Sequence, residues 1–139
     1  MLSRRLFSGC ALCSALGGVL GLTATSAQAQ PAPAAGGLTR TLVRRQDVAG
    51  TNFETIQMLV EIPANGEAAP HTHPGHEATY VIEGEGTLMV AGQPPRQLKP
   101  GDSFLVPTGV VHSAKNGPRP QKLFATFVVE KGKPLASPA

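Results

Sequence analysis

From Leu38 onward, glycine and proline interrupt the chain so often that no long element fits between them. Turn-forming groups such as Pro63-Ala-Asn-Gly66, Gly84-Glu-Gly86 and Pro107-Thr-Gly109 recur every eight to twelve residues. Only short strands fit into such intervals, and short strands at this spacing are typical of an antiparallel sandwich or barrel. The sequence therefore predicts an all-β domain.

The segment Phe53–Ile62 shows the strand pattern most clearly. Its apolar residues Ile56, Met58, Val60 and Ile62 fall on alternate positions, which predicts a strand with one buried face. Five more short β-type runs follow: Thr79–Ile82, Thr87–Val90, Ser103–Val106, Val110–Ala114 and Lys122–Val129. The turn at Gly84-Glu-Gly86 predicts a hairpin between the first two of these runs.

The first 29 residues have the composition of an export signal. Arg4-Arg5 gives a basic start, Cys10–Leu22 is apolar, and Ala27-Gln28-Ala29 offers small residues for cleavage. A membrane anchor is disfavoured because the apolar stretch is short and rich in Gly, Ala and Ser. Ser3-Arg4-Arg5-Leu6-Phe7 resembles a twin-arginine signal, so we expect a periplasmic or secreted protein without stable membrane anchoring after cleavage.

Removal of this signal changes the charge and the cysteine content. Cys10 and Cys13 would leave with it, so the mature chain would hold no disulfide. Because Arg4 and Arg5 would leave too, ten basic and nine acidic residues would remain. No basic stripe is present in the remainder, so we expect no nucleic-acid partner.

Low-complexity composition marks both edges of the domain. Residues 30–37 combine Pro, Ala and Gly and predict a flexible linker, and residues 131–139 predict a flexible tail. The β-barrel domain is therefore expected over residues 38–130. A chain this small, without a disulfide, often gains stability from a second copy, so we expect a homodimer, with Leu38–Val43 pairing across the two copies.

All four histidines fall in two segments, His71-Thr-His73-Pro-Gly-His76-Glu77 and Val110-Val-His112. Positions two apart on a strand share a face, so His71 and His73 can converge, and the Pro-Gly bend lets Glu77 return to them. Three imidazoles and one carboxylate suit Mn, Fe, Co, Ni, Cu or Zn. The alternative is a set of polar surface residues on turns. His76 is off parity and is expected to face solvent or to lie behind a ligand.

These residues carry a resemblance to a single-domain cupin. Its first motif, Gly-x5-His-x-His-x3or4-Glu-x6-Gly, is matched at His71, His73, Glu77 and Gly84, with Asn65 in place of the leading glycine. Asparagine also tolerates positive φ. The second motif is matched at Gly101, Pro107, Gly109, His112 and Asn116.

The resemblance implies a small double-stranded β-helix, or jelly-roll barrel, that holds one divalent transition metal. It implies that the metal ligands are His71, His73, Glu77 and His112. Four protein ligands leave coordination positions open, as in catalytic sites. We therefore expect a metal-dependent enzyme of oxygenase, lyase or isomerase type acting on a small oxygen-rich molecule, with Glu77 as a catalytic base. The alternatives are a non-catalytic module that binds a metal or small molecule, and a barrel with a vestigial site.

Overall fold

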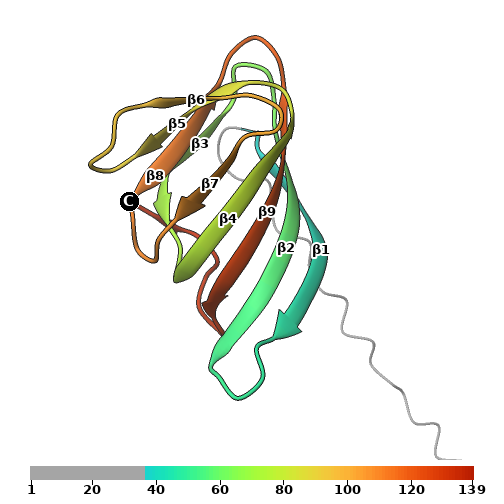
Figure 1. Cartoon of the computed structure of the whole chain (residues 1–139), viewed down its shortest axis with the longest axis vertical. Coiled ribbons are helices and arrows are strands. Elements are labelled where there is room, and N and C mark those ends of the chain that lie inside the picture. Colours follow the sequence, from blue (N-terminus) through green and yellow to red (C-terminus); the bar gives the residue numbers. More distant parts are fainter. Residues whose placement is uncertain (1–36) are drawn as a thin grey trace, which may run out of the picture.

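The computed structural model describes residues 37–139, and these form ten β-strands and no helix (Figure 1). The predicted export signal and the linker up to residue 36 lie outside the described residues. Within residues 37–139, there is accordingly no helix with the length and apolar character needed to cross a membrane.

The strands form two five-stranded antiparallel sheets that face each other. The first sheet contains, in spatial order, β1 (Thr39–Asp47), β2 (Phe53–Ile62), β9 (Gln121–Glu130), β4 (Gly75–Glu83) and β7 (Ser103–Val106). The second contains β10 (Ser137–Pro138), β3 (Glu67–Thr72), β8 (His112–Asn116), β5 (Gly86–Val90) and β6 (Arg96–Leu98). This arrangement confirms the predicted all-β jelly-roll barrel.

The core lies between the sheets and is built from alternate residues of the long strands. The apolar positions of β2 that the alternation singled out, Ile56 to Ile62, are all buried. On β9, which pairs with β2 along its whole length, the same holds for Leu123, Ala125, Phe127 and Val129. Burying one such side chain stabilises the fold by roughly 1.5–3 kcal/mol, so β2 and β9 supply much of the apolar core that lies under the site.

Gly75 allows β4 to begin earlier than the sequence predicts. The expected strand Thr79–Ile82 is preceded by four residues that also pair with β9. A Cβ atom at Gly75 would lie 2.0 Å from the carbonyl oxygen of Val128, so only glycine permits this close approach. The earlier start matters because it places Glu77 within a regular strand, facing inward.

Asn65 has the left-handed conformation expected where the cupin motif has glycine. Its φ is 57°, and its N–H donates to the carbonyl of Gly117 at 2.7 Å. The turn that leads into β3, the strand of His71, is therefore preserved despite the substitution.

Both ends of the domain make contacts that the sequence did not predict. Of the segment Leu38–Val43, the residues from Thr39 onward begin β1, which pairs with β2 of the same chain and forms an edge of its sheet; the homodimer and the pairing across it stay predictions. The segment expected to be a flexible tail contains β10, which pairs with β3, and Leu135 packs against the core. The composition of residues 131–139 did not predict these contacts, because they depend on one leucine and a few backbone hydrogen bonds.

Candidate metal centre

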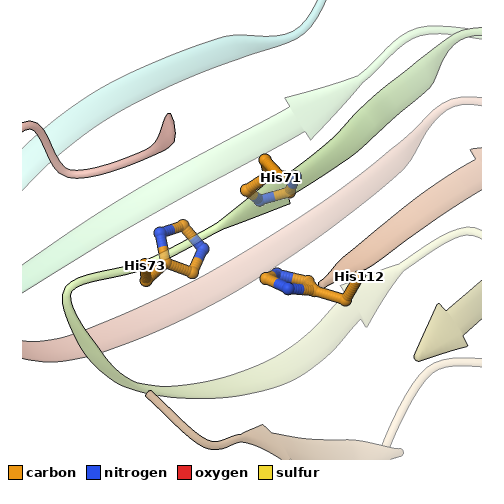
Figure 2. A group of neighbouring side chains, drawn as sticks. All are labelled: His71, His73 and His112. Carbon is orange, nitrogen blue, oxygen red and sulfur yellow. The ribbon is translucent and has the colours of Figure 1, made fainter. Parts of the chain in front are cut away.

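Three histidines meet at one end of the barrel (Figure 2). His71 lies near the end of β3, His73 follows in the turn, and His112 opens β8. The antiparallel register of β3 and β8 places His71 directly opposite His112. One ring nitrogen from each histidine lies within 4.8 Å of the others. The two segments singled out in the sequence therefore come together.

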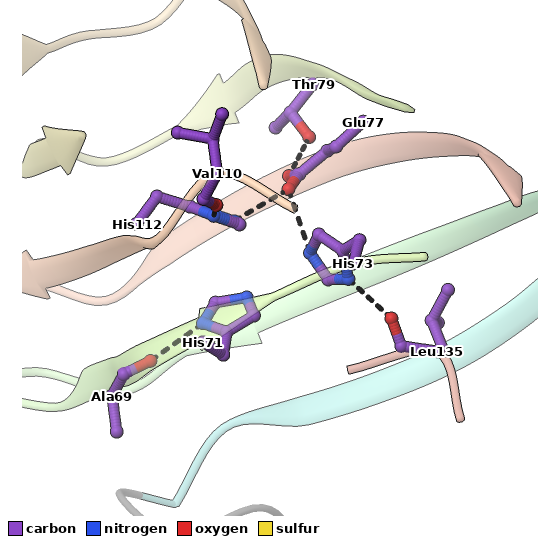
Figure 3. Close-up of polar contacts among 8 residues, drawn as sticks. All are labelled: Ala69, His71, His73, Glu77, Thr79, Val110, His112 and Leu135. Atoms are coloured by element: carbon purple, nitrogen blue, oxygen red, sulfur yellow. Dashed lines mark hydrogen bonds and ion pairs between the residues drawn. The ribbon is translucent and has the colours of Figure 1, made fainter. Parts of the chain in front are cut away.

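Glu77 reaches the same point from the opposite sheet (Figure 3). Its Oε2 atom lies 3.1 Å from Nε2 of His73 and 3.0 Å from Nε2 of His112. The side chain is buried, as are those of His73 and His112. His76, the preceding residue on β4, is exposed, because neighbouring side chains of a strand point to opposite faces. The structure thus brings together the four predicted ligands without His76.

Each of the three imidazoles is held from behind by a backbone carbonyl (Figure 3). The Nδ1 atoms of His71, His73 and His112 lie 2.7, 2.5 and 3.0 Å from the carbonyl oxygens of Ala69, Leu135 and Val110, respectively. A carbonyl only accepts, so each Nδ1 carries the proton and donates it. With a metal bound, Nε2 of each ring would be the coordinating atom, which is how protein imidazoles are oriented toward metals; without it, Nε2 of His73 and of His112 faces Oε2 of Glu77.

Hydrogen bonds hold the Glu77 carboxylate in its ionised form. Burial raises the pKa of this carboxyl, but hydrogen bonds from His112, His73 and Thr79 together outweigh burial and lower the pKa well below its usual value. On the imidazole side, burial lowers the pKa of His112, but the hydrogen bond to Glu77 and the one to Val110 leave it raised. In the absence of metal, the two pKa shifts therefore favour the carboxylate form of Glu77 and the imidazolium form of His112.

His71 is different, because it has no hydrogen bond to the carboxylate. Burial lowers the pKa of His71 to about 4, with the neighbouring imidazoles of His112 and His73 adding to the effect. The ring is therefore neutral at physiological pH. A neutral imidazole with a free Nε2 lone pair is the form that coordinates a metal.

The distances from the Glu77 carboxylate to two of the imidazoles fit a coordination sphere. Two ligands at right angles on an ion with bonds of about 2.1 Å lie about 3.0 Å apart, which matches the separations from Glu77 Oε2 to the two Nε2 atoms. Three nitrogens and one oxygen are the donor set of a borderline transition metal. The residues present therefore fit such an ion, and a possible metal site is supported.

A small cavity of about 40 Å³ opens beside the four donors. Its walls are mainly apolar, with Val60, Ile62 and Phe127 among them. Such walls limit water around the site and strengthen electrostatic interactions there. One arginine, Arg40 of β1, also lines the cavity.

Three residues around the site were not found from the sequence. Thr79 donates its hydroxyl to Oε1 of Glu77 at 2.6 Å, and its position two residues after Glu77 on the same strand was the available signal. Arg40 shares a strand face with buried Leu38, but the pairing of β1 with β2 was not foreseen. Leu135 contributes only a carbonyl oxygen, for which a sequence carries no signal.

Comparison with known proteins agrees with this geometry. The family model described as "Cupin domain" matches residues 58–133, more than half of the chain. The dimethylsulfoniopropionate lyase DddQ of Ruegeria pomeroyi is 34% identical over 74 residues, which are 53% of this chain and 35% of the lyase. The chain spans between about a third and three fifths of the curated relatives that it matches.

Solved structures show the same fold. The crystal structure of the Ruegeria pomeroyi lyase superimposes with a TM-score of 0.57 and 26% identity, over 61% of this chain and 43% of the lyase. A cupin-like protein from Thermotoga maritima superimposes with a TM-score of 0.61 and 23% identity, over 75% of this chain and 77% of that protein. The second likeness concerns the fold alone.

Proposed function

Because the chain belongs to the cupin family, we propose that it is a metal-dependent enzyme that acts on a small oxygen-rich molecule by lyase, isomerase or oxygenase chemistry. The observation that carries this proposal is the convergence of His71, His73, His112 and Glu77 from opposite sheets beside a cavity. The relative named as a lyase supports the lyase reaction within this range.

In this proposal, each residue of the site has its own role. A divalent transition metal at this point supplies a Lewis acid for a substrate oxygen. The three imidazoles, each fixed through Nδ1, present Nε2 to it. Glu77 binds through Oε2 while Thr79 holds Oε1. With a metal bound at this point, the Glu77 carboxylate would also be the group placed to accept a proton from a substrate.

A second candidate is a non-catalytic module that binds a metal ion. The size of the inner cavity, about 40 Å³, favours it, because this space admits only a few atoms beside the donors. Metal binding is common to both candidates, whereas turnover belongs only to the first.

The proposed ligands are tested by removing them one at a time. Purified wild-type protein and the variants His71→Ala, His73→Ala, His112→Ala and Glu77→Gln are titrated with Mn²⁺ and Zn²⁺ while metal content is measured by elemental analysis. Each histidine variant should lose affinity by orders of magnitude, because a coordinate bond is lost and the other donors are less organised. Glu77→Gln keeps an oxygen but loses the charge and the basicity.

His76→Ala is the matched control, because this histidine is a neighbour in sequence and exposed in the structure. It should change affinity by about tenfold at most, the scale of an indirect effect. Loss of metal in His76→Ala together with full metal in His73→Ala would contradict the ligand set. Once a substrate is known, a Glu77→Gln variant that keeps its metal but no longer turns over the substrate would favour the enzyme and exclude the binding module.

A further inference from the structure

Arg40 is a charged residue of the cavity that the proposed metal site does not use. It lies on β1 opposite Val60 of β2, and both residues line the inner cavity together with Glu77. The neighbouring residues Thr39 and Thr41 are exposed, whereas Arg40 is half-buried. Strand alternation therefore turns this one arginine toward the site.

The guanidinium of Arg40 has no close counter-ion in the part of the chain that the structure describes. No carboxylate oxygen of residues 37–139 lies within 4 Å of it. Burial lowers the pKa of Arg40, and the negative charge of Glu77 raises it again; an arginine stays protonated in either case. A half-buried cation that faces a cavity without a direct partner is costly, and a bound anion would offset that cost.

The proposed metal increases this excess of positive charge. Glu77 is the only carboxylate that lines the cavity among the described residues. A divalent ion bound by three neutral imidazoles and one carboxylate keeps one net positive charge, and Glu77 is then no longer available to balance Arg40. The occupied site would therefore attract an anion.

A second pocket shows where the rest of such a ligand would lie. This pocket of about 230 Å³ adjoins the inner cavity, and four residues line both of them: Leu38, Arg40, Ala68 and His71. Its other walls are formed by residues 69–70 and by the C-terminal residues 136–138, which are mostly alanine and proline. Arg40 thus lies between the inner cavity, which holds the four donors, and a larger apolar pocket.

Building on the proposed metal centre, we propose that Arg40 binds the carboxylate of a small substrate whose short aliphatic part occupies the adjoining pocket. The planar guanidinium offers two parallel N–H donors that match the two oxygens of a carboxylate. The ligand class is then a short-chain carboxylate, with its charged group between Arg40 and the metal position. Arg40 determines specificity, because a neutral molecule of the same shape leaves the cation unpaired.

Butyrate and its neutral amide, butyramide, test this without a known substrate. Both are titrated by isothermal calorimetry into full-length protein loaded with Mn²⁺, and metal content is measured in each sample. Butyrate should bind at least tenfold more tightly than butyramide, because the amide carries no negative charge and offers one acceptor oxygen in place of two. It should also bind more tightly than acetate, by about fourfold for each methylene that becomes buried.

Variants of Arg40 identify the residue responsible. Arg40→Gln should bind butyrate at least tenfold more weakly, with unchanged affinity for butyramide and full metal. Arg40→Lys, which keeps the charge but not the paired donors, should be intermediate. Arg44→Gln is the matched control on the same strand, because Arg44 is exposed and lines neither pocket; it should bind both probes as wild type does.

Three results would overturn the proposal: equal binding of butyrate and butyramide to wild type, wild-type affinity for butyrate in Arg40→Gln, or loss of Mn²⁺ from Arg40→Gln. Loss of Mn²⁺ from Arg40→Gln would mean that Arg40 positions Glu77 as a metal ligand and does not bind a substrate. The comparison of butyrate with butyramide needs only the wild-type protein, so it tests the proposal even if Arg40→Gln does not fold. A wild-type protein that takes up no metal would contradict the metal centre instead, and the butyrate titration of that protein would still measure Arg40 alone.

Discussion

Thr79 donates its hydroxyl hydrogen to Oε1 of Glu77 at 2.6 Å, from a position two residues further along the same strand. Both side chains are buried and face the interior of the barrel. Because Oε1 is engaged by Thr79, the other oxygen, Oε2, is the one directed at His73 and His112. The orientation of the proposed acidic ligand is thus fixed by a residue that does not touch the metal position.

Replacing Thr79 with valine should weaken metal binding by about ten- to a hundredfold, the usual effect of losing a hydrogen bond behind a ligand. Valine keeps the shape of the side chain but cannot donate, so Oε1 would be left buried without this partner. Thr79→Ser, which restores the hydroxyl, should bind nearly as wild type does. Competition with a chelator gives the affinities, and an unchanged affinity in Thr79→Val would show that the bond does not orient Glu77.

In metal-free protein, His71 should make the fold less stable as the pH falls from about 6.5 toward 4. Its pKa in the folded state is about 4, below the ordinary value of 6.5, so between these values the unfolded chain binds more protons. Protonation therefore favours unfolding there, and the effect is reduced by solvent screening because the ring is only partly buried. The raised pKa of His112 affects stability at higher pH. The stabilisation that it gives to the fold is complete below pH 6.5 and is lost as the pH rises above that value.

Urea unfolding of chelator-treated protein at several pH values measures this effect. His71→Gln should flatten the decline in unfolding free energy between about pH 6.5 and 4.5, above the range in which Glu77 becomes protonated. His76→Gln should leave the decline in place, because His76 is exposed. A wild-type stability that does not change over this interval would mean that His71 is not held in its neutral form by burial.

The export prediction concerns residues outside the described part of the chain. Replacing Arg4-Arg5 with two lysines should leave precursor in the cytoplasm, because the twin-arginine pathway depends on the arginine pair. If that pathway is used, the protein folds before export and acquires its metal in the cytoplasm. Cell fractionation measures the distribution, and normal export of the lysine variant would remove the basis for this pathway.

The sequence was sufficient for the fold and for the grouping of the proposed ligands. The alternation in β2 predicted its buried face, and the spacing from His71 to Glu77 predicted a cluster, because strand parity and turns act over a few residues. The contacts that were missed are long-range. His73 is separated by 62 positions from the carbonyl that orients it, and Arg40 reaches the site only because β1 adds to the edge of a sheet.

The C-terminal segment leads to the last prediction, because the carbonyl of Leu135 holds His73 at Nδ1. A chain that stops after Pro134 loses this acceptor together with β10, so the His73 ring is no longer held in its metal-binding orientation. Its metal affinity should fall by about ten- to a hundredfold. A chain that stops after Ala136 keeps Leu135 and loses only the pairing of β10 with β3, so a smaller loss is expected.

Leu135→Ala distinguishes the role of the Leu135 carbonyl from that of the Leu135 side chain. This variant keeps the backbone acceptor but removes the apolar contact of the side chain with the core, so it should lower the melting temperature more than the metal affinity. Metal affinity by chelator competition and melting temperature are measured for all three proteins. If the chain that stops after Pro134 binds metal as tightly as the full-length protein, then the barrel alone orients His73, and the terminal segment serves only as a wall of the pocket beside Arg40.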